Sequence, residues 1–194
     1  VREVVPNGID VSATIGDLPN LPGASSLAAL GATVSGADYV KASLFGVKTI
    51  SEAAYLIGEV CRAAKEQNEA TKVIAAGYAD FEKIGCLSPL KVPDVAYKAG
   101  ADGAMIDVNV KTHGGLFQLL SVDELRGFVE ESHELGLTVS LAGSLDKGDM
   151  ARVFGLGADI VGVRRAVCRG KDRLKGAVHR EAVGELVDEI RRLQ

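Results

Sequence analysis

Two lysines and one aspartate lie in or just after apolar segments, where charged side chains are unusual. Lys41 interrupts the apolar run 39–44, Asp107 lies in the run 103–108, and Lys111 follows four residues after Asp107. A lysine kept neutral by burial or by a second nearby cation can attack a carbonyl and form a Schiff base. An aspartate beside it can shuttle a proton or orient an ammonium. These residues point to aldol, dehydration or isomerisation chemistry on a carbonyl compound.

Small residues and arginines follow the two last apolar runs of this kind. Small residues let backbone N–H groups approach an anion, and arginine neutralises its charge. We therefore predict a phosphate-binding site formed by Gly143, Ser144, Gly162, Arg164 and Arg165. The alternative is that Gly143 and Gly162 only permit tight turns and that Arg165 is a solvated residue at a helix start.

A repeated tripeptide shows which elements position these residues. Gly-Ala-Asp recurs at 36–38, 100–102 and 157–159, each time just before an apolar run. Such a glycine ends a helix in the left-handed conformation, and a turn and a strand follow. Apolar runs predict strands at 9–15, 39–44, 72–78, 103–108, 138–141 and 160–163. Helical spacing and capping residues predict helices at 25–35, 49–66, 91–99, 121–135, 148–156 and 179–193.

Six βα units of about 30 residues each imply a parallel sheet with right-handed crossovers. The repeat favours an α/β fold of the TIM-type (βα) barrel class, which needs eight units. We expect one domain, 1–194, that is incomplete at the N-terminus and lacks the first two strands. An open sheet of six strands is the alternative, and its two exposed edges lead us to expect a homo-oligomer.

Alternation along the predicted strands assigns the polar residues to the inside of the barrel. The apolar positions of each run face the helices, and the other positions face inward: Ser12, Thr14, Lys41, Ser43, Asp107, Asn109, Lys111 and Ser140. A purely structural interior would be filled by Val, Ile and Leu, whereas barrel enzymes place their chemistry at the C-terminal ends of the strands. The alternative is a Lys41–Asp107 ion pair that only neutralises itself. His113, in a Gly-rich loop beside Lys111, could also reach a substrate.

Composition excludes several classes of function. The net charge is −4, from 22 Lys+Arg and 26 Asp+Glu, which argues against a nucleic-acid binder. No apolar run approaches the ~20 residues of a membrane-spanning helix, and no signal-peptide pattern is present. Three cysteines without zinc spacing indicate reduced thiols in a cytoplasmic protein. Because no dinucleotide fingerprint, phosphate-binding Walker loop or metal-ligand cluster is found, we expect no cofactor and no metal.

Six stretches, collinear over nearly the whole chain, resemble the (5-formylfuran-3-yl)methyl phosphate synthase family. They are Val-Ser-Ala-Thr-Ile-Gly-Asp (11–17), Ser-Gly-Ala-Asp-Tyr-Val-Lys (35–41), Ala-Ala-Gly-Tyr-Ala-Asp (75–80), Met-Ile-Asp-x-x-x-Lys (105–111), Leu-Ala-Gly-Ser (141–144) and Asp-Ile-Val-Gly-Val-Arg (159–164). The resemblance implies a class I aldolase-like lyase in methanofuran biosynthesis. Such an enzyme joins two molecules of glyceraldehyde 3-phosphate and eliminates water and phosphate.

The resemblance also implies roles for particular residues. Lys41 matches the proton-accepting lysine of the family, and Asp107 and Lys111 match its further active-site aspartate and lysine. The family's Schiff-base lysine lies in an Asp-x-Lys-Asn-Pro-like segment on an early strand, which this sequence does not contain. We therefore expect this chain alone to lack the covalent nucleophile and to be inactive by itself. The alternative function is a non-catalytic protein that binds a phosphorylated ligand or serves in assembly.

Overall fold

The computed structural model describes residues 2–169 and 176–193, and its centre is a six-stranded parallel sheet. The strands follow one another in chain order, so each pairs with its sequence neighbours. They are β1 (Ser12–Thr14), β2 (Tyr39–Ser43), β3 (Lys72–Tyr78), β4 (Gly103–Asp107), β5 (Thr138–Ala142) and β6 (Ile160–Gly162). All six predicted strands are confirmed, although β1 is shorter than the predicted 9–15. Sequential order with parallel pairing is the arrangement of a (βα) barrel rather than of a doubly wound sheet.

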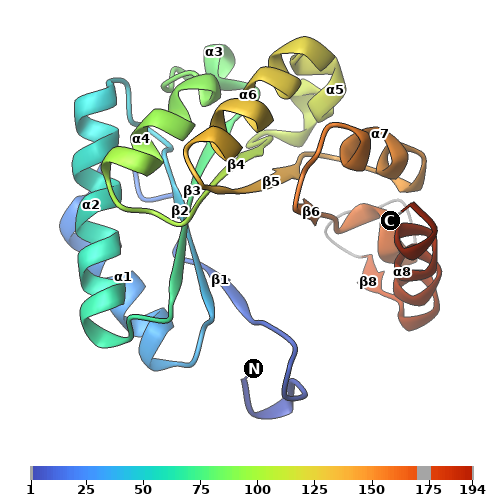
Figure 1. Ribbon diagram of the computed structural model, residues 1–194, viewed down its shortest axis with the longest axis horizontal. Coiled ribbons are helices and arrows are strands. Elements are labelled where there is room, and N and C mark those ends of the chain that lie inside the picture. The colour runs from blue at the N-terminus through green and yellow to red at the C-terminus, as the bar shows by residue number, and fades with distance from the viewer. Residues whose placement is uncertain (1, 170–175, 194) are drawn as a thin grey trace.

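Helices cover the outer face of this curved sheet (Figure 1). The longer ones are α1 (Pro22–Val34), α2 (Ile50–Gln67), α4 (Val92–Lys98), α6 (Val122–Glu134), α7 (Met150–Gly155) and α8 (Arg180–Leu193). They match the six predicted helices within a few residues. Thr49 and Ser121 cap α2 and α6 through capping boxes with Glu52 and Glu124. Each cap satisfies N–H groups that a helix start would leave unpaired.

Short elements were not predicted from the sequence. In the described part of the chain they are the four-residue helices α3 (Phe81–Ile84) and α5 (Leu116–Leu119), five 3₁₀ turns, and the antiparallel pair β7 (Cys168–Arg169) and β8 (Ala177–Val178). One of the 3₁₀ turns, η3 (Lys111–His113), contains the candidate site residue Lys111. Elements of two to four residues are too short to show a hydrophobic period.

The repeated Gly-Ala-Asp tripeptide has a structural role at the N-terminal edge of the sheet. Gly36, Gly100 and Gly157 have φ values of +84°, +72° and +93°, as predicted for left-handed helix ends. The three aspartates hold the adjacent strand. Asp38, Asp102 and Asp159 accept the backbone N–H groups of Val11, Val73 and Val139 at 2.6, 2.8 and 2.7 Å. Each repeat therefore ties the start of one strand to its neighbour.

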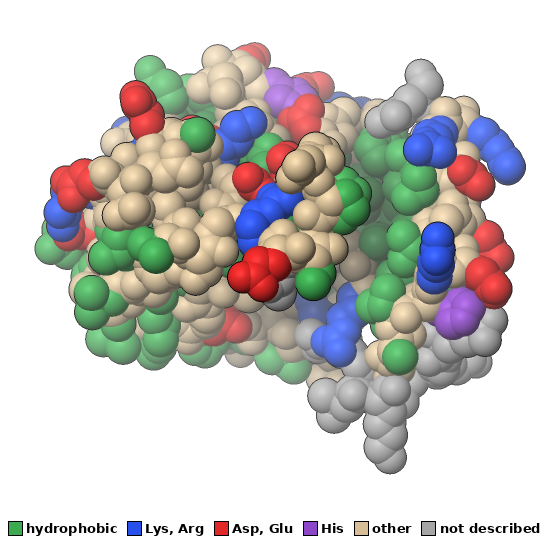
Figure 2. Space-filling model, turned by 90° about the horizontal axis from the view of Figure 1, so that it is seen from below, with side chains coloured by type: hydrophobic (Ala, Val, Ile, Leu, Met, Phe, Trp, Pro, Cys, Tyr) green, Lys and Arg blue, Asp and Glu red, His purple; other side chains and the backbone are tan. Residues whose placement is uncertain are grey.

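The two faces of the sheet differ as the alternation predicted. Val40, Ala42, Ala104 and Ile106 pack into the large core beneath the helices. The inner face has a smaller apolar cluster of Ile74, Ala76, Met105 and Ala142, with Tyr39 against it. Polar side chains lie beyond this cluster, toward the C-terminal ends of the strands. Seen from below, a hollow lies between the C-terminal segment that ends in α8 and the rest of the molecule (Figure 2).

Candidate active site

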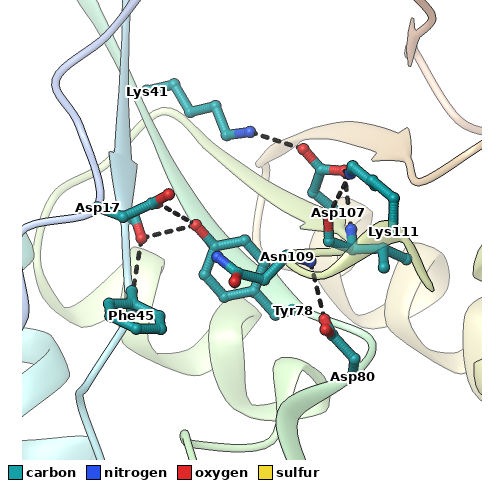
Figure 3. A network of polar contacts seen from close by, with 10 residues as sticks. Asp17, Lys41, Phe45, Tyr78, Asp80, Asp107, Asn109 and Lys111 are labelled. Carbon is teal, nitrogen blue, oxygen red and sulfur yellow. Dashed lines mark hydrogen bonds and ion pairs between the residues drawn. The ribbon is translucent and has the colours of Figure 1, made fainter. Parts of the chain in front are cut away.

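Two lysines and one carboxylate meet at the C-terminal end of the sheet (Figure 3). Lys41 Nζ, from β2, lies 3.0 Å from Asp107 Oδ2, and Lys111 Nζ lies 2.8 Å from Asp107 Oδ1. Asp107 is the last residue of β4, and Lys111 also donates to the carbonyl of Val108. The ion pair that the sequence suggested as a structural alternative is therefore present, but with a second cation on the same carboxylate.

The balance of charge in this cluster favours contact with an anionic ligand. One carboxylate faces two ammonium groups, and the three side chains remain between 20% and 24% exposed. Burial by itself would raise the pKa of Asp107, but Lys41 and Lys111 outweigh it and hold this pKa below its ordinary value. Asp107 therefore stays ionised at neutral pH, and the cluster carries a net positive charge that is open to solvent.

A pocket of about 380 Å³ opens beside the cluster, and all five predicted phosphate-binding residues line it. Asp107 and Lys111 form one side, and the loops after β5 and β6 form the other: Gly143, Ser144, Gly162, Arg164 and Arg165. Its charged lining residues are thus three cations and one anion. Arg165 donates to the carbonyl of Ser144 at 3.0 Å, which joins the two loops. A phosphate group fits this combination of charges.

The two glycines of this pocket are also required by close packing. A Cβ atom on Gly143 would lie 2.7 Å from Val108 Cγ2, and one on Gly162 would lie 2.7 Å from Ala142 Cβ. Gly143 has φ of +120°, and the next residue, Ser144, has φ of +57°. A positive φ is uncommon for serine and often marks a functional loop. Glycine at these positions is thus explained by packing, whether or not the loops bind phosphate.

A second polar network lies beside the lysine cluster on the inner face (Figure 3). The buried Tyr78 hydroxyl lies 2.8 Å from Ser43 Oγ and donates to the carboxylate of Asp17. Burial first, and then the carboxylate of Asp17, raises the pKa of Tyr78 above its ordinary value. Asn109 also hydrogen-bonds to this hydroxyl. Tyr78 therefore remains a neutral phenol that joins the loops after β1 and β4.

Asp80 fixes the loop that contains Lys111. Its carboxylate accepts the N–H groups of Asn109 and Val110 at 2.8 and 2.9 Å and lies 2.9 Å from Nδ1 of His113. The imidazole of His113 therefore contacts Asp80. That His113 reaches a substrate stays a prediction.

Sequence reasoning missed Tyr78 and Asp80, because β3 shows no alternation of polar and apolar residues. Six of its seven residues are buried, so both faces are apolar. Such strands read as continuous apolar runs. Counting in twos from Ile74, which faces inward, would have assigned Tyr78 to the inner face.

In 2–169 and 176–193, no three His, Cys, Asp or Glu side chains are grouped so that they could hold a metal ion. Within those same residues, no helix is long and apolar enough to span a bilayer.

The fold and the position of the cluster define a protein of the (βα)-barrel class, and solved structures agree on the fold. KGPDC from Streptococcus mutans superposes with a TM-score of 0.64 at 18% identity, over 99% of this chain and 76% of that chain. The 3-hexulose-6-phosphate synthase of Salmonella typhimurium gives 0.62 at 17% identity, over 88% and 69%. At such identities the likeness shows the fold alone.

Sequence similarity identifies the family. The family model described as 4-HFC-P synthase matches residues 1–187. A (5-formylfuran-3-yl)methyl phosphate synthase of Methanocaldococcus jannaschii is 48% identical over 186 residues, 96% of this chain and 79% of that protein. The synthase of Methanopyrus kandleri is 46% identical over 190 residues, 98% of this chain and 80% of that protein. The chain belongs to the (5-formylfuran-3-yl)methyl phosphate synthase family, as its sequence motifs indicated.

Proposed function

We propose that this chain provides the active-site cluster of an enzyme that condenses two molecules of glyceraldehyde 3-phosphate to (5-formylfuran-3-yl)methyl phosphate in methanofuran biosynthesis. The observation that supports this best is the carboxylate of Asp107 between the Lys41 and Lys111 ammonium groups, beside a pocket lined by Arg164 and Arg165. Family membership favours this enzyme over the non-catalytic binding or assembly protein. We place it among the aldolase-like carbon–oxygen lyases, acting in the cytoplasm without nucleic acid or cofactor.

Each residue has a distinct task in this proposal. Lys41 first transfers a proton to the carboxylate of Asp107 and, as a neutral amine, then accepts the proton from the carbon next to the substrate carbonyl. The Lys111 ammonium protonates the departing oxygen, and Asp107, which contacts both lysines, returns its proton to Lys111. Arg164 and Arg165 hold the phosphate and thereby fix the carbonyl carbon near the cluster. A Schiff-base lysine from an Asp-x-Lys segment, which the resemblance implies and these 194 residues lack, would supply the covalent step.

Replacement of Lys41 tests the catalytic role. In the complete protein, Lys41→Ala is expected to abolish product formation, a loss of at least about 10²-fold, because the proton acceptor is removed. Circular dichroism should show an unchanged fold, since Asp107 keeps Lys111 as a partner. Lys98→Ala is the matched control: Lys98 forms an exposed ion pair with Asp94 on α4. Near-normal turnover of Lys41→Ala would show that Lys41 is structural.

Binding of inorganic phosphate tests the pocket separately from turnover. Arg164→Ala is expected to weaken phosphate binding by about tenfold, the effect of losing one charge-assisted hydrogen bond. Calorimetric titration measures this directly. Arg62→Ala, which removes an exposed arginine paired with Glu59 on α2, should leave the affinity unchanged. Equal affinities of the two variants, or a phosphate-soaked crystal with anions only elsewhere, would remove the claim.

A further inference from the structure

The loop between β4 and α5 must be held in place if Lys111 is to meet Asp107. This loop consists of a short turn around Lys111, followed by Gly114 and Gly115. A lysine has a flexible four-carbon stem, so the position of its ammonium depends on where its backbone is fixed. The residue that fixes the loop would therefore control the cluster without touching the substrate.

Asp80 has the contacts needed for this task. Its side chain is fully buried, yet it accepts two backbone N–H groups of the loop and contacts the imidazole of His113. These contacts lie on both sides of Lys111, at Asn109 and Val110 before it and at His113 after it. Burial raises the pKa of Asp80, but the two N–H groups and His113 outweigh this and lower it below its ordinary value. The carboxylate of Asp80 is thus ionised, and an ionised carboxylate forms stronger hydrogen bonds than a neutral acceptor.

Neighbouring contacts make the anchor rigid. The N–H group of Ala79 donates to the carbonyl of Asp107 at 2.8 Å, which fixes the end of β3 against the end of β4. Lys83, three residues after Asp80, donates to the carbonyl of His113 at 3.0 Å. The segment 79–83 therefore holds the β4–α5 loop at its beginning and at its end.

We propose that Asp80 is a positioning residue whose carboxylate fixes the backbone around Lys111 and so sets how the Lys111 ammonium meets Asp107. The effect of Asp80 on catalysis rests on the proposed function, whereas its effect on the position of Lys111 does not. Asp80→Asn keeps one acceptor oxygen and turns an NH₂ group towards a loop N–H. A buried N–H would then lack its partner, and the loop would loosen.

Asp159 offers a matched control within the same chain. Its carboxylate also accepts one backbone N–H, from Val139, and lies 3.0 Å from a histidine, His133. However, Asp159 directly precedes β6. It therefore lies at the N-terminal ends of the strands, whereas the cluster lies at their C-terminal ends. Asp159→Asn removes the same kind of contact at a site that does not hold a catalytic loop.

Two measurements on the complete protein test the positioning itself and require no product. The first is trace acetylation, read for each lysine by peptide mass spectrometry. Asp80→Asn is expected to raise labelling of Lys111 by about threefold or more, because opening of the loop frees its amine from Asp107. Labelling of Lys65, which pairs with Asp102 at the N-terminal ends of the strands, should not change. The second is hydrogen exchange, in which the Val110 amide should lose protection in Asp80→Asn and keep it in Asp159→Asn.

Kinetics then test the catalytic consequence. Asp80→Asn is expected to lower kcat by about 10²-fold, the cost of misplacing a catalytic group by about 1 Å, with little change in KM. Asp159→Asn should stay within about twofold of the parent. In a Lys111→Ala background, Asp80→Asn should have almost no further effect, because the two residues act as one unit.

The outcomes separate this inference from the proposed function. Unchanged Lys111 labelling and Val110 exchange in Asp80→Asn would overturn the positioning role. Raised labelling together with unaltered turnover would confirm the positioning and overturn the catalytic role of Lys111. If Asp80→Asn does not fold, His113→Ala removes one of the three contacts. It should raise Lys111 labelling by a smaller factor of about twofold, and unchanged labelling would overturn the inference.

Discussion

At the scale of single residues, Asp107 is the centre of the charge balance. Its carboxylate stands between two ammonium groups, whereas a barrel interior without such a site would be aliphatic. Removing it would leave two neighbouring cations without a shared anion. Substitution of Asp107 should therefore lower the free energy of unfolding more than substitution of Lys41 or Lys111.

The lowered pKa of Asp107 predicts how stability depends on pH. The pKa is lower in the folded state than in the unfolded state. Its stabilising contribution is therefore complete above the unfolded value of about 3.9 and is lost as pH falls through the folded value. Asp107→Asn should lower the free energy of unfolding at pH 7 and make its decline below about pH 4 shallower than in the parent.

Urea unfolding at pH 7, pH 4 and pH 3 measures this difference. Asp94→Asn is the control, since Asp94 forms an exposed ion pair with Lys98 on the surface of α4 and such pairs contribute little. Parallel curves for Asp107→Asn and the parent would show that the Asp107 ion pairs do not stabilise the fold.

Sequence alone predicted those residues whose polarity breaks an apolar pattern. Lys41 and Asp107 could be assigned to the inner face because Val40, Ala42, Ala104 and Ile106 fix the alternation around them. Tyr78 and Asp80 could not be found in this way, since β3 is buried on both faces. Their roles depend on contacts with residues 29 to 61 positions away in the chain, which no local pattern reveals.

At the scale of elements, glycines decide how closely the loops of the pocket approach one another. Gly143 connects β5 to the pocket at a point where Val108 leaves no room for a Cβ atom. Leu116, the first residue of α5, donates its N–H to the carbonyl of Gly143 at 2.9 Å. The start of α5 is thus joined to the loop after β5, and Ser144 of this loop lines the same pocket as Lys111.

Alanine substitutions at two glycines should have effects of opposite sign. Gly143→Ala is expected to lower the free energy of unfolding by about 1–3 kcal/mol, because it overpacks against Val108 and has an unfavourable φ. Gly127→Ala, in the middle of α6 with open space around it, should raise that free energy by about 0.5–1 kcal/mol. Urea denaturation checks both, and a Gly143→Ala variant as stable as the parent would show that the loop adapts freely.

The order of the elements was predictable because each strand and helix has its own local signal. Left-handed glycines, capping boxes and apolar runs gave six strands and six long helices in the observed positions. The short helices α3 and α5 lie between stronger signals, and tertiary contacts stabilise them instead. The N–H of Leu116 at the start of α5, for example, is bonded to the β5 loop.

At the scale of the whole molecule, the sheet has two edges among the described residues. β1 and β6 each have one neighbouring strand in the order β1 to β6. The hydrogen bonds of β1 show which of its backbone groups face β2. The carbonyl of Val11 accepts the N–H of Tyr39, and the N–H of Ile15 donates to the carbonyl of Lys41. Since pairing alternates along a strand, the N–H groups of Ser12 and Thr14 point away from β2.

An unpaired parallel edge is a template for another chain, so we expect this 194-residue chain to self-associate. Sedimentation velocity should show species larger than the 20.2 kDa monomer. Ser12→Pro removes an edge N–H at the first position of β1, where proline is tolerated, and should shift the distribution towards monomer. Ser12→Ala keeps that N–H and should behave like the parent. A monodisperse monomer for the parent chain would contradict the prediction. An unchanged distribution for Ser12→Pro would instead place the contact away from the β1 edge.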